Sequence, residues 1–201
     1  MAYPVPRHFH RVEEIIRRSR FITSVAHTPT RDAAKAFIER IRAEFTDANH
    51  NCMAFVAGPP ASTAQVGMSD DGEPRGTAGR PMLNTLAHSG VGEITAVVTR
   101  YFGGIKLGTG GLVRAYSGSV RQALADLPVR EKIIPTTVPV IIGYACITPV
   151  RRLATAFDAE IIEETYGADV SLTFELPVEK AEDFRAALID LTHGELVIGT
   201  S

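Results

Sequence analysis

Hydrophobic residues in the first part of the chain alternate between strand-like and helix-like spacing. Residues 21–28 are rich in β-forming side chains and predict a strand. Residues 51–57 predict a second strand that is apolar on both faces, which is typical of a strand covered on both sides. Between them Thr30 fits a helix N-cap, and apolar residues follow it at helical spacing: Phe37, Ile38, Ile41 and Phe45.

Glycine and proline residues divide the next part of the chain. Residues 58–80 are polar and predict a long loop, and Pro81 suits the first turn of a short helix. A strand is predicted over 94–102 and a helix over 112–126. Between them, residues 103–111 contain five glycines and predict a tight loop.

The pattern changes near Pro135, where we expect a domain boundary. Beyond it the chain predicts strand, helix, strand, strand, helix and strand, over 137–146, 149–158, 160–166, 169–176, 178–192 and 195–199. This βαββαβ order is that of a ferredoxin-like sandwich. The sequence therefore predicts an α+β protein with one domain in 1–134 and a ferredoxin-like domain in 135–201.

The formal net charge of −2 conceals an uneven distribution. Residues 1–134 carry 17 Lys and Arg against 12 Asp and Glu, a balance of +5, whereas residues 135–201 carry 4 against 11, a balance of −7. A basic first half favours an anionic partner. The alternative is that surface charge drifts between domains without a functional cause.

Several classes of protein are excluded by composition. Two cysteines rule out a disulfide framework and a four-cysteine metal site. The histidines lack metal-ligand spacing, so we expect no metal and no cofactor. We find neither a signal-peptide pattern nor the roughly 20 apolar residues of a membrane helix. We therefore expect a cytoplasmic protein with no membrane partner, and the sequence leaves its oligomeric state open.

The segment 100–116 carries the richest candidate chemistry, because a strand runs through the glycine-rich loop into a helix. Glycines let backbone N–H groups approach a ligand closely, and a helix N-terminus carries partial positive charge. The segment predicts an anion site in which the side chains of Arg100, Lys106 and Arg114 form one positive patch. The predicted anion-binding residues are Arg100, Lys106, Gly108, Thr109, Gly110, Gly111 and Arg114, together with Arg75 from the preceding loop. The spacing is neither a Walker loop nor a Rossmann fingerprint. The alternative is a tight turn that binds no ligand.

An acidic run in the long loop is the second candidate. Asp70, Asp71 and Glu73 could hold a divalent cation, although the run does not fit a calcium loop. One alternative is an ordinary solvated loop. Another is a set of ion pairs, with Arg75 and Arg80, that clamps the glycine-rich loop.

His50 and Cys52 are the third candidate. His50 directly precedes the predicted strand 51–57 and, being two positions from Cys52, faces the same side of it. This placement permits a nucleophilic cysteine–histidine pair. The alternatives are a small buried apolar role for Cys52 and a bracing role for His50.

Three motifs, in this order and spacing, resemble the IMPACT/YigZ family: HNCMAF at 50–55, SDDGEPRGTAGRP at 69–81 and VVTRYFGGIKLGTGGLVRAY at 97–116. The resemblance covers roughly residues 15–125, and residues 139–195 look like the ferredoxin-like domain that bacterial members carry next. The family's motif positions in this chain are His50, Cys52, Asp71, Gly72, Glu73, Gly76, Thr77, Gly79, Arg100, Tyr101, Phe102, Gly103, Gly104, Lys106, Gly108, Gly110 and Arg114. Two positions depart from the family: Met53 replaces a common aromatic, and Arg75 replaces a small residue and adds positive charge.

The resemblance implies a two-domain fold. The first domain would be a β/α sandwich of the type shared by a small-subunit ribosomal protein and domain IV of elongation factor G, and the second would resemble domain V of that factor. Eukaryotic relatives act as translational regulators, but they carry an additional partner-binding domain that this chain lacks. The family as a whole has no settled enzymatic activity.

Three hypotheses of function follow. The first is a translation-associated protein that binds RNA or the ribosome through the basic loop, with Tyr101 or Phe102 stacking a base. Because neighbours on a strand face opposite ways, we expect one of these two aromatic residues in the core. The second is an enzyme acting on a phosphorylated small molecule, with the glycine-rich loop as phosphate cradle and Asp71 or Glu73 as base or magnesium ligand. The third is a protein-interaction module whose acidic half binds a basic partner.

Overall fold

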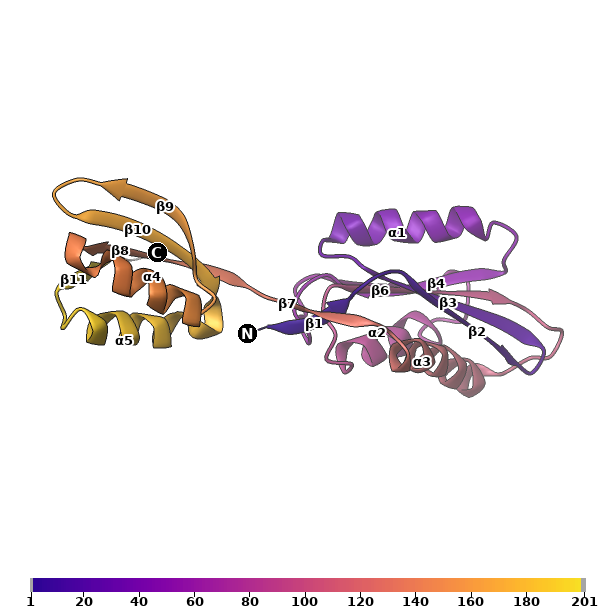
Figure 1. Ribbon diagram of the computed structural model, residues 1–201. Helices are drawn as coiled ribbons and strands as arrows, with labels where there is room; N and C mark the ends of the chain where they lie inside the picture. The colour runs from indigo at the N-terminus through magenta and orange to yellow at the C-terminus, as the bar shows by residue number, and fades with distance from the viewer. Residues whose placement is uncertain (1, 200–201) are drawn as a thin grey trace. The chain divides into compact units, whose positions relative to one another are not determined.

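The computed structural model describes residues 2–199 and divides them into two compact units (Figure 1). One unit is Tyr3–Lys132, and the other holds Ala2 and the residues from Ile133 onward. Both units combine helices with antiparallel sheet, so the protein is α+β as predicted.

A five-stranded antiparallel sheet forms the centre of the unit Tyr3–Lys132, in the order β2-β3-β6-β4-β5. The middle strand β6 is buried at every position except its last, because helices cover both faces of the sheet. The strands are β2 (His10–Ile16), β3 (Ser19–His27), β4 (His50–Val56), β5 (Val66–Ser69) and β6 (Ile94–Tyr101).

Three helices cover this sheet. Helix α1 (Arg31–Glu44) packs on one face, and its first turn is capped by the Thr30 hydroxyl, which accepts from Ala33 N–H at 3.1 Å. Helices α2 (Gly79–Ala87) and α3 (Thr109–Ala125) pack on the other face (Figure 1). The larger apolar core lies on that second face, and the candidate site lies at its edge.

A separate two-stranded ribbon pairs β1 (Tyr3–Pro6) with β7 (Val129–Lys132). Both strands are held to the body of the unit by the buried carboxylate of Glu93. Tyr3 donates its hydroxyl proton to Glu93 at 2.9 Å, and Lys132 forms an ion pair with the same carboxylate. The ribbon thus ties the start of the unit to its end.

The second unit has the predicted βαββαβ order, and its four strands lie in the order β11-β8-β10-β9. Inward residues alternate with outward ones along β10, so the sheet buries one face under the two helices. Its elements are β8 (Pro135–Ile142), the 3₁₀ turn Tyr144–Cys146, α4 (Ile147–Ala156), β9 (Glu160–Tyr166), β10 (Val170–Pro177), the 3₁₀ turn Val178–Lys180, α5 (Ala181–Leu191) and β11 (Leu196–Ile198).

The structure differs from the predicted elements chiefly at the sheet edges. Strands β1, β2 and β7 lie where no strand was predicted, and β5 lies inside the predicted loop 58–80. The two helices on the site's face also begin earlier than predicted, at Gly79 and at Thr109. Over residues 2–199, no helix has the length and apolarity to cross a membrane.

Candidate functional site

Asp70 braces the start of α2. Its carboxylate accepts hydrogen bonds from the backbone N–H groups of Gly76, Ala78 and Gly79 at 2.8, 3.0 and 2.8 Å. Burial alone would raise the pKa of Asp70, but these hydrogen bonds outweigh it and hold the pKa below its ordinary value. The carboxylate is therefore committed to the fold.

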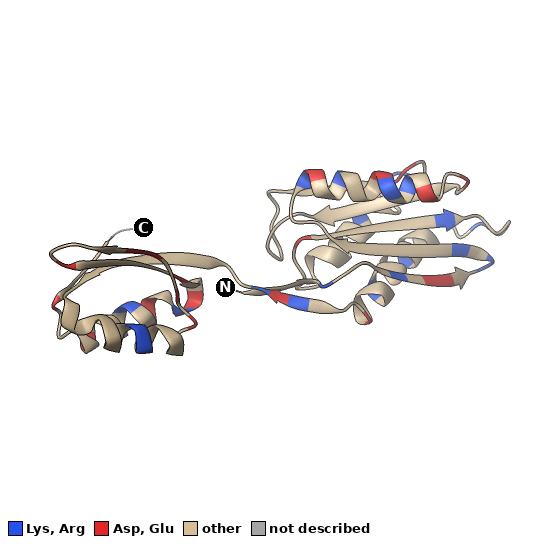
Figure 2. Cartoon of the chain, turned by 45° about the horizontal axis from the view of Figure 1, so that its top comes forward, with Lys and Arg blue, Asp and Glu red and all other residues tan. Residues whose placement is uncertain are grey.

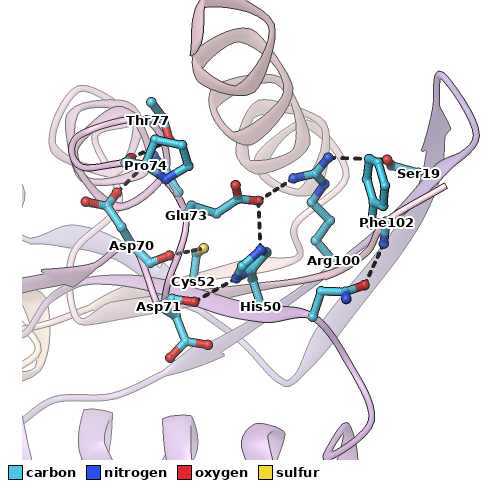
Figure 3. A network of polar contacts seen from close by, with 12 residues as sticks. Ser19, His50, Cys52, Asp70, Asp71, Glu73, Pro74, Thr77, Arg100 and Phe102 are labelled. Atoms are coloured by element: carbon cyan, nitrogen blue, oxygen red, sulfur yellow. Dashed lines mark hydrogen bonds and ion pairs between the residues drawn. The ribbon is translucent and has the colours of Figure 1, made fainter. Parts of the chain in front are cut away.

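Asp71 ties the same turn to β4 and α1. Its carboxylate accepts from Asn51 N–H at 2.7 Å and from the guanidinium of Arg42 at 3.1 Å. Its backbone oxygen contacts Nδ1 of His50 at 2.8 Å (Figure 3). Both carboxylates of the turn thus have other partners, and no cluster of three His, Cys, Asp or Glu suited to a metal occurs within residues 2–199.

Glu73 and Arg100 form a buried ion pair at the end of β6, next to the glycine-rich loop. Arg100 Nη1 donates to Glu73 Oε1 at 2.5 Å, and the two side chains are only 6% and 3% exposed (Figure 3). The hydroxyl of Tyr116, from α3, donates to the same oxygen at 2.8 Å. The acidic turn is thus tied to β6 through Arg100, not to the glycine-rich loop through Arg75 or Arg80.

Cys52 is a buried thiol without the features of a nucleophile. Its side chain is fully buried, and Sγ donates to the backbone oxygen of Asp70 at 2.9 Å. Burial is the main cause that raises the pKa of Cys52 to about 12, so its thiolate is scarce at neutral pH. The ring of His50 instead contacts Asp71. The structure therefore favours the apolar role for Cys52 and the bracing role for His50.

The glycine-rich loop packs directly against the turn between β2 and β3. A Cβ on Gly103 would lie 1.9 Å from the backbone oxygen of Arg18, a distance that no side chain permits. Gly103 N–H also donates to the hydroxyl of Ser19 at 3.2 Å. This close approach brings Arg17 and Arg18, both exposed, beside the loop. These two arginines were not predicted as site residues because no strand was predicted over 10–16, although two β-rich segments flank the Arg17–Arg18 dipeptide.

The three cations of segment 100–116 do not form the single patch that was predicted. Arg100 is buried and its charge is compensated by Glu73. Lys106 lines the same cavity as Arg100, whereas Arg114 lines a separate hollow together with Arg17. The patch differs from the prediction because residue 100 lies on the middle strand, where helices cover both faces of the sheet.

The two aromatic residues after Arg100 lie at the surface. The Tyr101 hydroxyl donates to Asp47 at 2.7 Å, and its side chain is half-buried. Phe102 is 47% exposed, and its N–H donates to the side-chain oxygen of Asn49 at 2.7 Å. The expectation that one of the pair lies in the core is wrong, because β6 ends at Tyr101 and the chain leaves the covered part of the sheet.

The remaining motif residues shape the turns around the site. Thr77 donates its hydroxyl proton to the backbone oxygen of Pro74 at 2.6 Å. A Cβ on Gly79 would lie 2.9 Å from the backbone of Ser69, so only glycine fits there. Positive φ angles occur at four further motif glycines: Gly72, Gly76, Gly104 and Gly108.

These segments surround one cavity of about 430 Å³, at the ends of β4 and β6 and the start of α3. Helix α3 begins at the N-cap Gly108 without a capping side chain, so its first backbone N–H groups have no side-chain acceptor at this end of the helix. The lining residues are Asn49, His50, Glu73, Pro74, Arg100, Phe102, Lys106, Leu107, Gly108, Thr109 and Leu112. An apolar wall, a lysine and a helix N-terminus thus meet at one place, which suits an anion attached to an apolar group.

Comparison with known families decides the relationship of the chain. The Impact N-terminal domain matches residues 17–124, and a domain of unknown function, DUF1949, matches residues 140–195. The chain belongs to the IMPACT family. Every motif residue described above lies within its IMPACT domain.

Relatives of the same family cover nearly the whole chain. It is 52% identical to the IMPACT family member YigZ of Escherichia coli (strain K12), over 92% of this chain and 91% of that protein. It is 43% identical to an IMPACT family member of Haemophilus influenzae, over 98% and 95%. A crystal structure of a hypothetical protein, 48% identical, matches with a TM-score of 0.69 and covers 100% of this chain and 97% of that one.

Proposed function

We propose that this protein binds RNA, free or on the ribosome, in a translation-associated role. The observation that carries the proposal is the contact between the β2–β3 turn and the glycine-rich loop. Four exposed cations lie around that contact: Arg17 and Arg114 line one hollow, Lys106 lines the cavity that shares Leu107 with it, and Arg18 belongs to the turn itself. Blue Lys and Arg segments lie at this end of the sheet in Figure 2.

The four cations are available to phosphate. None of them forms an ion pair within residues 2–199, in contrast to Arg100, whose charge Glu73 compensates. Contacts to phosphates supply most of the sequence-independent affinity for nucleic acid. Phe102 lies nearby with an exposed ring, and exposed aromatic rings stack the bases of single-stranded RNA.

The β2–β3 turn itself supports a functional use of its arginines. Arg17 and Arg18 have φ angles of +46° and +67°, and they form a two-residue turn between β2 and β3. Such turns favour Asn-Gly, because L side chains adopt positive φ at a cost. Strained backbone tends to gather at functional sites. Two arginines at these positions therefore fit a binding role better than a purely structural one.

The enzyme hypothesis gains less from the geometry. Asp71 is used by Asn51 and Arg42, and Glu73 is used by Arg100 and Tyr116. A general base or a magnesium ligand needs a carboxylate with free lone pairs directed at a substrate. The site therefore favours binding of a polyanion over catalysis.

A salt titration tests the proposal. Binding of a fluorescent single-stranded RNA is measured by anisotropy, and each phosphate contact contributes a slope of about −0.7 in log K against log salt. Four contacts would give a slope of roughly −3. The double variant Arg17→Asn/Arg18→Gly should lose about two contacts and flatten the slope by about 1.4.

The same variant separates binding from folding. Asn and Gly suit the turn better, so this variant should be more stable than the wild type by about 1–2 kcal/mol, seen as a higher melting temperature. The control is Arg31→Ala, an exposed arginine on α1 across the sheet, which should leave the slope unchanged. Absence of RNA binding at low salt, or equal loss in the control, would refute the proposal. Co-sedimentation with ribosomes, with and without RNase, tests the ribosomal setting.

A further inference from the structure

The cavity of about 430 Å³ beside the glycine-rich loop has a more specific chemistry than the basic surface around it. One of its walls is apolar and is formed by Pro74, Phe102, Leu107 and Leu112. Its polar lining residues include His50, Lys106, Thr109 and the Glu73–Arg100 pair, and the lining continues into the start of α3. A volume of this size suits a small molecule of a few hundred daltons.

The charge in the cavity that no neighbouring side chain compensates is positive. Glu73 would repel an anion, but Arg100 lies 2.5 Å from its Oε1 and Tyr116 donates to the same atom. Lys106 has no ion-pair partner within the described part of the chain, and the uncapped start of α3 adds partial positive charge. The cavity therefore favours an anionic group near Lys106 and Thr109.

Arg100 supplies an independent sign that a ligand belongs here. Its Nη1 and Nη2 donate to Glu73 and Ser19, but its Nε is buried without a hydrogen-bond partner in residues 2–199. A buried N–H of a charged group without a partner is costly, and a ligand acceptor that reached it would remove that cost. Arg100 lines the cavity, so an anion bound there would lie close to this guanidinium.

His50 adds a second group that a phosphate can use. Its Nδ1 contacts the backbone oxygen of Asp71 at 2.8 Å, and because a carbonyl only accepts, the Nδ1 carries the proton. Nε2 lies 3.8 Å from Glu73 Oε1, beyond hydrogen-bond distance. With the proton on Nδ1, Nε2 is an acceptor and can bind the hydroxyl proton of a phosphate monoanion.

The apolar wall indicates what the anion is attached to. The exposed ring of Phe102 lies over the Arg100 guanidinium, 5.6 Å from centroid to Cζ. A planar base can stack on the outer face of that ring, and such stacking contributes substantially to binding whichever base is present. A phosphate near Lys106 and a flat aromatic group on Phe102 together describe a nucleotide.

We propose that this cavity binds a single nucleoside monophosphate unit, with its phosphate at Lys106, Thr109 and the start of α3 and its base on Phe102. The unit comes either from a free nucleotide or from the phosphorylated end of an RNA chain. Where the unit belongs to an RNA chain, this proposal rests on the proposed RNA-binding function, and the cavity holds one nucleotide of the RNA.

Calorimetric titration of the full chain with AMP, adenosine and inorganic phosphate tests the site. AMP should bind at least about tenfold more tightly than adenosine or phosphate alone, because only AMP contacts both Lys106 and Phe102. Lys106→Ala should weaken AMP about tenfold and leave adenosine unchanged. Phe102→Ala should weaken AMP and adenosine about tenfold and leave phosphate unchanged. Arg31→Ala is the matched control and should change none of these affinities.

Competition experiments distinguish the two sources of the nucleotide and separate this proposal from the RNA-binding function. If the unit is an RNA end, a 5′-phosphorylated oligonucleotide should bind more tightly than its 5′-hydroxyl form and should displace AMP. If the unit is a free nucleotide, AMP should bind and neither oligonucleotide should displace it. The two oligonucleotides should then bind with equal affinity. RNA binding without measurable AMP binding at millimolar concentration overturns the cavity proposal and leaves the RNA function standing. AMP binding without RNA binding overturns the RNA-binding function and leaves the cavity proposal standing.

Discussion

The buried pair of Glu73 and Arg100 offers the sharpest test of how the site is held together. Glu73→Gln keeps the shape of the side chain and an oxygen that can accept from Tyr116, but it removes the negative charge. Arg100 then remains buried, at 6% exposure, with no compensating carboxylate. The substitution therefore isolates the charge itself.

The expected loss of stability follows from that burial. Breaking a buried ion pair by removing one partner costs about 3–5 kcal/mol, because the other charge stays unpaired. We take the lower end, about 3 kcal/mol, because Ser19 still accepts from Arg100 and the guanidinium lies against the rings of Phe21 and Phe102. That loss corresponds to a factor of roughly 10² in an opening equilibrium.

Hydrogen exchange measures this loss within one unit of the chain. Amides of β6, which carries Arg100, and of the neighbouring strand β4 should exchange roughly 10²-fold faster in Glu73→Gln than in the wild type. Amides of β10, in the other unit, serve as the internal reference. The double variant Glu73→Gln/Arg100→Met removes both charges and should return to within about 1 kcal/mol of the wild type. A change of less than about threefold in the single variant, or no recovery in the double variant, would refute the reasoning.

Three further predictions concern single residues. Iodoacetamide should label Cys146, which is half-buried, well before Cys52, whose burial raises its pKa to about 12; faster labelling of Cys52 by peptide mass spectrometry would contradict its burial. Gly103→Ala should lower the melting temperature, because its Cβ meets the backbone of the β2–β3 turn, whereas Gly118→Ala, with open space in α3, should raise stability by about 0.5–1 kcal/mol. The pKa of Asp70 is lowered in the folded state, so its stabilisation is complete above the unfolded pKa, near 4, and is lost as pH falls through the lower folded pKa. Stability of Asp70→Asn, followed by urea denaturation from pH 5 to pH 2, should therefore fall less than that of the wild type.

Elements that bury a face carry a local signal in the sequence, whereas edge strands do not. The strand over 94–102 and the three longest helices were anticipated, because each buries a face and so repeats apolar residues at a regular spacing. Strand β2 was missed, since it is an edge strand whose charged residues mask the alternation. Strand β5, at the other edge, has only four residues. Edge strands pair through the backbone, and that pairing needs no apolar pattern.

Part of the site could also be anticipated. The clustered glycines and the acidic turn marked the segments that meet at the cavity, because turn conformations and close backbone contacts demand particular residue types locally. The buried state of Cys52 followed in the same way from its place in an apolar strand. These properties depend on a residue and its near neighbours, so a single sequence reveals them.

The partners of each charge depended on contacts between distant segments. Arg100 was expected to bind an anion of a ligand, but the fold places the carboxylate of Glu73 beside it, 27 positions away in the chain. Arg17 and Arg18 were not considered, although the fold brings their turn against Gly103. Charge is a property of a residue, whereas burial and compensation depend on what the folded chain places next to it. Long-range packing therefore decided which cations of this protein are available to a ligand.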